Sequence, residues 1–328
     1  MTRARHQLID LSATSYYHVI NRCVRRSFLC GDDPYTQRNY DHRRQWLVDR
    51  IKHLSSIYSI NIAAYAIMSN HYHLVLQVDK VTADMWTMDE VIERWYRLYS
   101  GHPMVDDYLA NRNMSAVKLA KVEEYVQCWR DRLYDISWFM KCLNEHISRE
   151  ANKEDNCTGK FWEGRFKSQA LLDETALLSC MAYVDLNPIR AGIASNMMDS
   201  NFTSIQERLK QFKSHQRQQA RPNTDYRVPS QPHALLPFSP VADNNAIPLS
   251  YSDYFELVDW SGRHIDPKKT GFIDDSEPAI LQTLGIDSDD WQLAVRDFRR
   301  QYGSFAGSAM QLRNYAHRHG RSWCKGVG

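Results

Sequence analysis

Along residues 15–190 the spacing of hydrophobic and polar positions changes repeatedly, and each spacing predicts a different element. Short runs of β-branched and aromatic residues, typical of strands, occupy 15–24, 60–68, 71–78 and 165–172. Apolar residues at helical spacing predict helices over 40–59, 88–99, 135–155 and 173–186. Asp135 and Asp173 stand where an N-cap is expected, and the Asn187-Pro188 pair ends the last of these helices.

The order strand, helix, strand, strand, helix, strand, helix is the split β-α-β pattern of ferredoxin-like folds. The fold class expected is therefore α+β, with an antiparallel sheet, helices on one face and a C-terminal helical appendage. We expect a domain over 1–200 with a helical insertion near 85–133. A linker, first basic and then rich in Pro, Ser and Gln, is predicted over 201–250, followed by a mostly helical region with a basic tail over 251–328.

Composition narrows the class of protein without identifying it. The formal net charge is only +2, but basic residues predominate in 1–60, 201–221 and 291–328, so basic surfaces are compatible with the near-neutral total. The seven cysteines include no C-x-x-C pair, which favours a reducing compartment. The N-terminus lacks the apolar stretch of a signal peptide, and the uncharged run 55–78 is too polar for a membrane span. We expect a soluble cytoplasmic protein with no membrane partner.

The strand at 71–78 carries two histidines one residue apart. Because side chains two residues apart share a strand face, His71 and His73 point the same way, and Tyr72 and Leu74 point the other way. Two imidazoles on one face can bind one metal ion, or they can be ordinary solvated or packed side chains. The short motif alone leaves both interpretations open.

The helix at 135–155 adds an acidic candidate. At 100° per residue, Glu150 falls within about 20° of the direction of Leu143, inside an apolar stripe, and His146 lies at the edge of that stripe. A buried carboxylate must be paired, protonated or bound to a metal. Glu150 could therefore face His71 and His73 as a third metal ligand, or it could reach water at the frayed end of the helix.

Four segments in order resemble a known family. They are YYHVINRCVRR, YAIMSNHYHLVL, GKFWEGRFKS and YVDLNPIRAG, and they lie within roughly residues 10–195. Together they resemble the REP-associated tyrosine transposases, which are single-tyrosine transposases of bacterial insertion sequences within the HUH endonuclease superfamily.

The resemblance implies a mobile-element enzyme, usually dimeric, that cleaves and transfers hairpin-bearing single-stranded DNA. His71 and His73 match the paired-histidine motif and would bind Mg²⁺ or Mn²⁺, with a third ligand from the helix that bears the nucleophile. The metal would polarise the scissile phosphate, and a tyrosine hydroxyl would attack it to give a 5′-phosphotyrosine and a free 3′-OH.

The tyrosine expected from the resemblance is absent. Counting back from Gly159, the usual positions hold Ile147 or Glu150, and no tyrosine occurs between Tyr134 and Tyr183. Three interpretations stay open. In the first, another tyrosine acts as the nucleophile, either Tyr183, which is the nearest, or Tyr134. In the second, a metal-activated water or His146 attacks the phosphate. In the third, the protein has become a DNA-binding protein that no longer cleaves.

Basic residues near the motifs are the candidates for DNA contacts. They are Arg22, Arg25, Arg26, Arg165, Lys167 and Arg190, and the basic tail from Arg313 to Lys325 could hold a hairpin backbone. The two functions to be distinguished are metal-dependent cleavage and strand transfer of hairpin DNA, and binding of such DNA without cleavage.

Overall fold

The structure is a computed structural model. It describes residues 8–24, 29–33, 37–219, 235–241, 243, 245–265, 278–320, 322 and 324–326. The strands are β1 Tyr16–Arg22, β2 Ile60–Ile67, β3 His71–Val78, β4 Lys167–Leu171 and β5 Phe305–Ala306. The helices before β4 are α1 His42–Ser55, α2 Lys80–Met85, α3 Met88–Tyr96, α4 Pro103–Ala110, α5 Ala116–Leu133 and α6 Ile136–Glu154. Those after β4 are α7 Glu174–Asp185, α8 Asn187–Arg190, α9 Ser204–Gln219, α10 Tyr251–Ile265, α11 Ala279–Leu284, α12 Ser288–Gln301 and α13 Ala309–Arg318.

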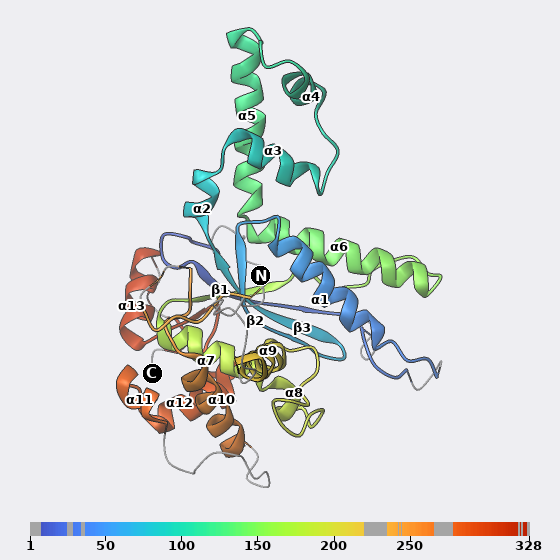
Figure 1. The fold of residues 1–328 in the computed structure, drawn as a ribbon. Helices are drawn as coiled ribbons and strands as arrows, with labels where there is room; N and C mark the ends of the chain where they lie inside the picture. The colour runs from blue at the N-terminus through green and yellow to red at the C-terminus, as the bar shows by residue number, and fades with distance from the viewer. Residues whose placement is uncertain are drawn as a thin grey trace. The chain divides into compact units, whose positions relative to one another are not determined.

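The described strands form one sheet in the order β2-β3-β1-β4-β5, and with the surrounding helices they make an α+β fold (Figure 1). β1 pairs antiparallel with both β3 and β4, whereas β5 pairs parallel with β4. A turn through Ser69 and Asn70 joins β2 to β3, and the amide of Met68 donates to the carbonyl of His71 at 2.9 Å. The sheet is therefore mixed, where the sequence predicted an antiparallel one.

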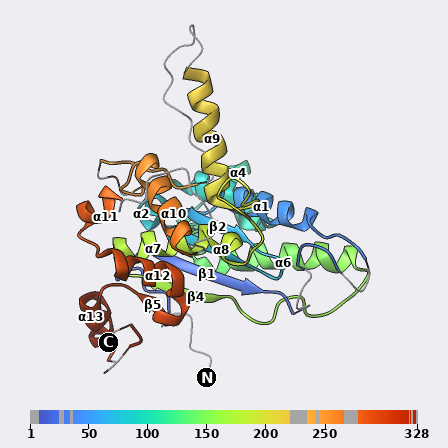
Figure 2. The same cartoon turned by 90° about the horizontal axis from the view of Figure 1, so that it is seen from below.

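The described residues divide into two compact units. The first comprises Met1–Gln45, Ile62–Gln77 and Gly159–Gly328, and the second comprises Trp46–Asn61 and Val78–Thr158. Within the first unit, α7, α10 and α12 pack against one another (Figures 1 and 2). The core there joins buried residues of α7 to apolar residues of the C-terminal helices. Asp173 caps α7 as predicted, accepting from the amide of Ala176 at 2.9 Å.

The C-terminal region contributes directly to this unit. β5 lies beside β4, and the amide of Leu172 donates to the carbonyl of Ala306 at 2.8 Å. Trp291 of α12 is fully buried and donates from Nε1 to Ser261 Oγ at 2.8 Å. The sequence predicted a mostly helical appendage over 251–328. The described part of that region is mostly helical, and it also adds β5 to the sheet and apolar residues to the core of the first unit.

Residues 204–219 form α9 where the sequence predicted a linker. Ile205 and Leu209 are buried one turn apart, and the buried guanidinium of Arg208 donates to the carbonyls of Ala63 and Leu236 at 2.9 Å each. Ile205, Leu209 and Phe212 are the only apolar residues in this stretch, which is rich in Gln and Lys, and they are a weak sequence signal. The packing of this helix depends on contacts distant in sequence. Residues 220–234 of the expected linker lie outside the described residues.

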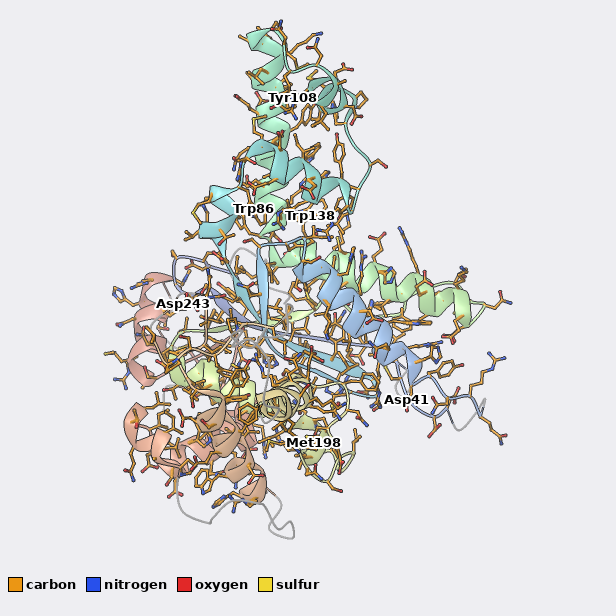
Figure 3. The ribbon with its side chains drawn as sticks, in the orientation of Figure 1. Asp41, Trp86, Tyr108, Trp138, Met198 and Asp243 are labelled. Atoms are coloured by element: carbon orange, nitrogen blue, oxygen red, sulfur yellow. The ribbon has the colours of Figure 1, made fainter. Side chains whose placement is uncertain are left out.

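The second unit is built largely from helices. α2 to α5 follow β3 over 80–133, and Thr87 and Glu90 form a reciprocal capping box at the start of α3. Trp95 and Trp129 stack with ring centroids 5.5 Å apart. Asp135 caps α6 as predicted, because its side chain accepts from the amide of Trp138 at 3.0 Å. Figure 3 labels Trp138 on α6 and Trp86 at the end of α2.

None of the helices in the described ranges combines the length and apolar character that a membrane span requires.

Candidate metal centre

Three histidines of the first unit gather on one face of the sheet. The register pairs Ile20 of β1 with His73 of β3, and His18 with Val75, so His18 and His73 are diagonal neighbours on the same face. Their rings stack with centroids 5.2 Å apart and planes 12° from parallel. The rings of His71 and His73 lie 4.9 Å apart, which agrees with the strand alternation that predicted a shared face.

A chain of hydrogen bonds determines which nitrogen of His73 carries the proton. Gln169 Nε2 donates to the carbonyl of Gly303 at 2.8 Å, so its Oε1 faces His18 Nδ1 at 3.2 Å. The Nδ1–H of His18 donates to that oxygen, which leaves His18 Nε2 as an acceptor. His73 Nδ1 lies 2.9 Å from His18 Nε2 and must therefore carry the hydrogen. His73 Nε2 then has a lone pair, and this buried atom has no hydrogen-bond partner.

The same reasoning applies to His71. Its Nδ1 lies 2.6 Å from Asn70 Oδ1, and an amide oxygen can only accept. Nδ1 of His71 therefore carries the hydrogen, and its Nε2 carries the lone pair. Both histidines of the motif thus present an unprotonated Nε2 from one face of β3, and the lone pair of a neutral imidazole is the form that binds a metal.

The protonation states agree with this arrangement. Burial, the largest cause, lowers the pKa of His18 to about 4 and that of His71 to about 4. Burial also lowers the pKa of His73 well below its ordinary value, and the neighbouring His18 and His71 add to the effect. All three imidazoles are therefore neutral near pH 7.

Aromatic side chains from α7 and α12 cover the imidazoles. The ring of Tyr183 meets that of His73 edge-on at 5.7 Å, and Phe298 meets His18 edge-on at 6.0 Å. Tyr183 and Phe298 stack on each other at 5.5 Å. The sequence led us to expect the helix at 135–155 against these imidazoles, whereas the contacts described here come from α7 and α12. Local periodicity does not say which sheet face a helix covers, so this placement depends on tertiary packing.

Tyr183, the nearest candidate for a substitute nucleophile, thus lies against His73. Its side chain is only 5% exposed, and burial raises the pKa of its hydroxyl although the positive charges of Arg190 and Arg299 lower it. The guanidinium of Arg190 lies over the Tyr183 ring at 4.7 Å and also donates to the carbonyl of Arg296. The guanidinium of Arg190 therefore contacts other protein groups and also places a positive charge beside Tyr183.

Glu150 and His146 belong to α6 of the second unit. The apolar stripe predicted on this helix is present and includes Leu143 and Ile147, but Glu150 is half-buried at its margin. Burial lowers the pKa of His146. Among the residues that the structure describes, no group of three or more His, Cys, Asp or Glu side chains is arranged to hold a metal ion. A third ligand from this helix stays a prediction.

The candidate DNA-binding residues fall into three groups. Arg22, Arg165 and Lys167 are exposed, and the amide of Glu163 donates to the carbonyl of Arg22 at 2.9 Å, which brings their segments together. Arg190 is half-buried, as described above. Arg25 and Arg26 lie outside the described residues, and so does Arg321 of the basic tail, whereas Arg313 is exposed on α13.

Trp162 precedes Arg165 and Lys167 in the sequence, and its side chain is buried. In the structure Trp162 is 8% exposed, and its ring meets that of Tyr72 edge-on at 5.6 Å. It therefore packs in the interior of the first unit.

The sequence also left some residues of the site unnoticed. His18, Gln169 and Phe298 all contact the imidazole cluster, yet only the pairing of β1 with β3 and β4, and of α12 with α7, brings them there. A possible signal was the histidine within the YYHV strand, because a polar residue in an otherwise apolar strand requires a partner.

No protein-family model matches the chain, and no curated protein matches it significantly. Among solved structures, it is similar to one described as "Structure of the REP associates tyrosine transposase bound to a REP hairpin". The identity is 13%, the TM-score is 0.38, and the match covers 65% of this chain and 87% of that chain. A match this distant carries no inference about what the present chain binds or does.

Proposed function

We propose that this protein binds hairpin-bearing single-stranded DNA and, with a divalent ion at His71 and His73, performs phosphoryl transfer at a phosphodiester. The observation that carries the proposal is the pair of unprotonated Nε2 atoms on one face of β3, one of them buried and without a hydrogen-bond partner. The resemblance of Asn70 to His73 to the paired-histidine motif of HUH enzymes supports it independently of the geometry.

The donor set fits a divalent ion with open coordination positions. Two imidazole nitrogens favour a transition-metal ion over Mg²⁺, which prefers oxygen, so Mn²⁺ suits this site better. When bound, such an ion would polarise the phosphate and stabilise the charge that develops on it. His71 and His73 would hold it, Glu150 is the proposed third ligand, and phosphate oxygens or water would complete the coordination.

The fold supports the same assignment. The order β2-β3-β1-β4, with α1 between β1 and β2 and a helical segment between β3 and β4, agrees with the split β-α-β arrangement. We infer a ferredoxin-like domain of the HUH type, to which β5 adds a parallel edge strand. Assembly as a homodimer is part of the proposal by resemblance.

The DNA path proposed here runs over the end of β1. Arg22 pairs with His71 in the register, and Lys167 pairs with Ile20. The exposed cations of Arg22, Arg165 and Lys167 would contact phosphates, and the positive charges of Arg22 and Arg299 act on His71. Cations around the metal ligands favour an anionic substrate.

A second function, DNA binding without cleavage, is favoured by one specific observation. The hydroxyl of a nucleophilic tyrosine must reach the phosphate, but Tyr183 is buried beneath Phe298 and Arg190, and the segment from 135 to 182 contains no tyrosine. Attack by Tyr183 would require these side chains to move aside. Attack by Tyr134, by water or by His146 is the remaining route to cleavage.

A denaturing gel distinguishes these functions. End-labelled DNA hairpins with randomised single-stranded flanks are incubated with the protein and Mn²⁺, and a native gel is run in parallel. A band of DNA retained on denatured protein indicates a covalent tyrosine intermediate, and Tyr183→Phe should remove it. Shortened DNA without that band indicates hydrolysis. A native shift with intact DNA supports the second function, and no shift would contradict both.

The control for the cleavage reaction is a matched pair of histidine variants. His71→Ala removes one proposed ligand and should abolish cleavage while leaving the native shift. His53→Ala removes a histidine from α1, outside the motif, and should leave both unchanged.

A further inference from the structure

The hydrogen-bond chain that ends at His73 begins in the C-terminal region. The carbonyl of Gly303 accepts from Gln169 Nε2 at 2.8 Å. This carbonyl is held in place because the neighbouring residues follow β4: the amide of Ala170 donates to the carbonyl of Ser304 at 3.0 Å, and Phe305 begins β5. The orientation of the Gln169 amide is thus fixed by a segment more than 130 residues away in sequence.

Each later link in the chain is determined by the one before it. With its NH₂ group on Gly303, Gln169 can offer only an oxygen to His18. His18 then donates from Nδ1 and accepts at Nε2, and His73 must donate from Nδ1. Gln169 is 8% exposed, His18 is 1% exposed and His73 is fully buried, so water does not offer an alternative partner inside the chain.

A free imidazole in water favours the tautomer with the hydrogen on Nε2, in which that nitrogen cannot bind a metal. In metal sites the second ring nitrogen of a histidine ligand usually donates to an acceptor, which fixes the tautomer and the ring orientation. For His73 that acceptor is His18. Phe298 packs edge-on against the His18 ring, with centroids 6.0 Å apart.

We propose that His18 and Gln169, anchored by the Gly303 carbonyl, are positioning residues that hold His73 in the Nδ1–H tautomer and direct its Nε2 lone pair into the metal site. The role of this relay in metal binding rests on the proposed function, which makes His73 a ligand. The tautomer itself is a property of the metal-free protein. The proposal also gives the C-terminal segment around Gly303 a role in the site.

The first test determines the tautomer of His73 in the wild-type protein. The metal-free protein, labelled with ¹⁵N-histidine, is studied by long-range ¹H–¹⁵N correlation NMR, which distinguishes the two neutral tautomers. His73 is identified from the spectrum of a His73→Gln variant. The expected result is hydrogen on Nδ1 of His73. A hydrogen on Nε2 of His73 would overturn the proposal.

The second test compares two substitutions of similar size. In His18→Gln, the new amide can accept from His73 and donate to Gln169, so the tautomer and the Mn²⁺ affinity should be retained. In His18→Leu the acceptor is lost, so His73 should move to the Nε2–H tautomer and Mn²⁺ affinity should fall about 10- to 100-fold. Gln169→Leu acts one link earlier and should weaken Mn²⁺ binding in the same direction, which provides the readout if His18→Leu fails to fold.

The outcomes separate the two proposals. If the wild-type protein binds no Mn²⁺, the metal-dependent function fails, and the NMR result alone decides whether the relay sets the tautomer. If Mn²⁺ binds and His18→Leu and His18→Gln bind it equally well, the relay does not position the ligand and the inference is wrong.

Discussion

The hydroxyl of Tyr254 on α10 lies 2.6 Å from Oδ2 of Asp185, the last residue of α7, and both side chains are fully buried. The other carboxylate oxygen accepts from Ser204 Oγ at 2.5 Å and from the amide of Ile205 at 3.0 Å. One carboxyl group therefore joins α7 to the start of α9 and to α10. A carboxylate at the start of a helix is favourable, but its burial is costly.

Stability should depend on pH through Asp185. Burial raises the pKa of this carboxyl from 3.8 to about 6, against the lowering effect of the hydrogen bonds from Ser204 and Tyr254. A folded-state pKa above the unfolded value means that Asp185 stabilises the fold most below pH 3.8 and that this contribution is lost as the pH rises through about 6. At about 1.4 kcal/mol per pKa unit, the change is about 3 kcal/mol.

Asp185→Asn tests this dependence because asparagine keeps an acceptor and cannot ionise. Urea unfolding of the two proteins at pH 4, 5, 6 and 7 gives the difference in the free energy of unfolding. The wild type should lose up to about 3 kcal/mol relative to the variant between pH 4 and pH 7. Parallel pH curves for the two proteins would show that Asp185 ionises normally in the fold.

DNA binding should depend on salt through the exposed cations near β1. Each phosphate contact contributes about −0.7 to the slope of log K against log salt for a single strand. Arg22→Gln should weaken hairpin binding and make this slope shallower by about 0.7. Fluorescence anisotropy of a labelled hairpin over a range of KCl concentrations measures it. Arg149→Gln on α6, also an exposed arginine, is the control and should leave the slope unchanged.

Strand alternation was sufficient to place His71 and His73 on one face, because the pleat fixes a period of two residues. The same alternation could not find His18, which reaches His73 only through the register of β1 with β3. Nor could it show that α7 covers the imidazoles, since a helical pattern identifies a buried face but not the surface against which it packs. Gln169 depends on a carbonyl from residue 303, a contact that no local pattern encodes.

Trp291 tests whether the C-terminal region is part of the first unit in solution. The indole is fully buried and bonded to Ser261, so Trp291→Ala should destabilise the protein by about 3–5 kcal/mol. If residues 251–328 instead fold independently, near-UV circular dichroism and urea unfolding should show a separate transition whose midpoint alone responds to the substitution. Leu293→Ala on the same helix, at a side chain 42% exposed, is the control and should cost much less.

The last prediction concerns Glu150, the proposed third metal ligand. Ligands that bind only the folded state stabilise it by about 2.7 kcal/mol at a hundredfold excess over Kd. If Glu150 is the third ligand, Mn²⁺ should raise the melting temperature of the wild type, and Glu150→Gln should lose most of that rise while its metal-free melting temperature stays near or above the original. His71→Ala should lose the same response.

Glu154→Gln removes an equal charge one turn further along α6 and should respond to Mn²⁺ like the wild type. If Glu150→Gln also responds like the wild type, Glu150 is not a ligand. The third position then falls to His146, to Asn152 or to water, and the metal centre rests on His71 and His73.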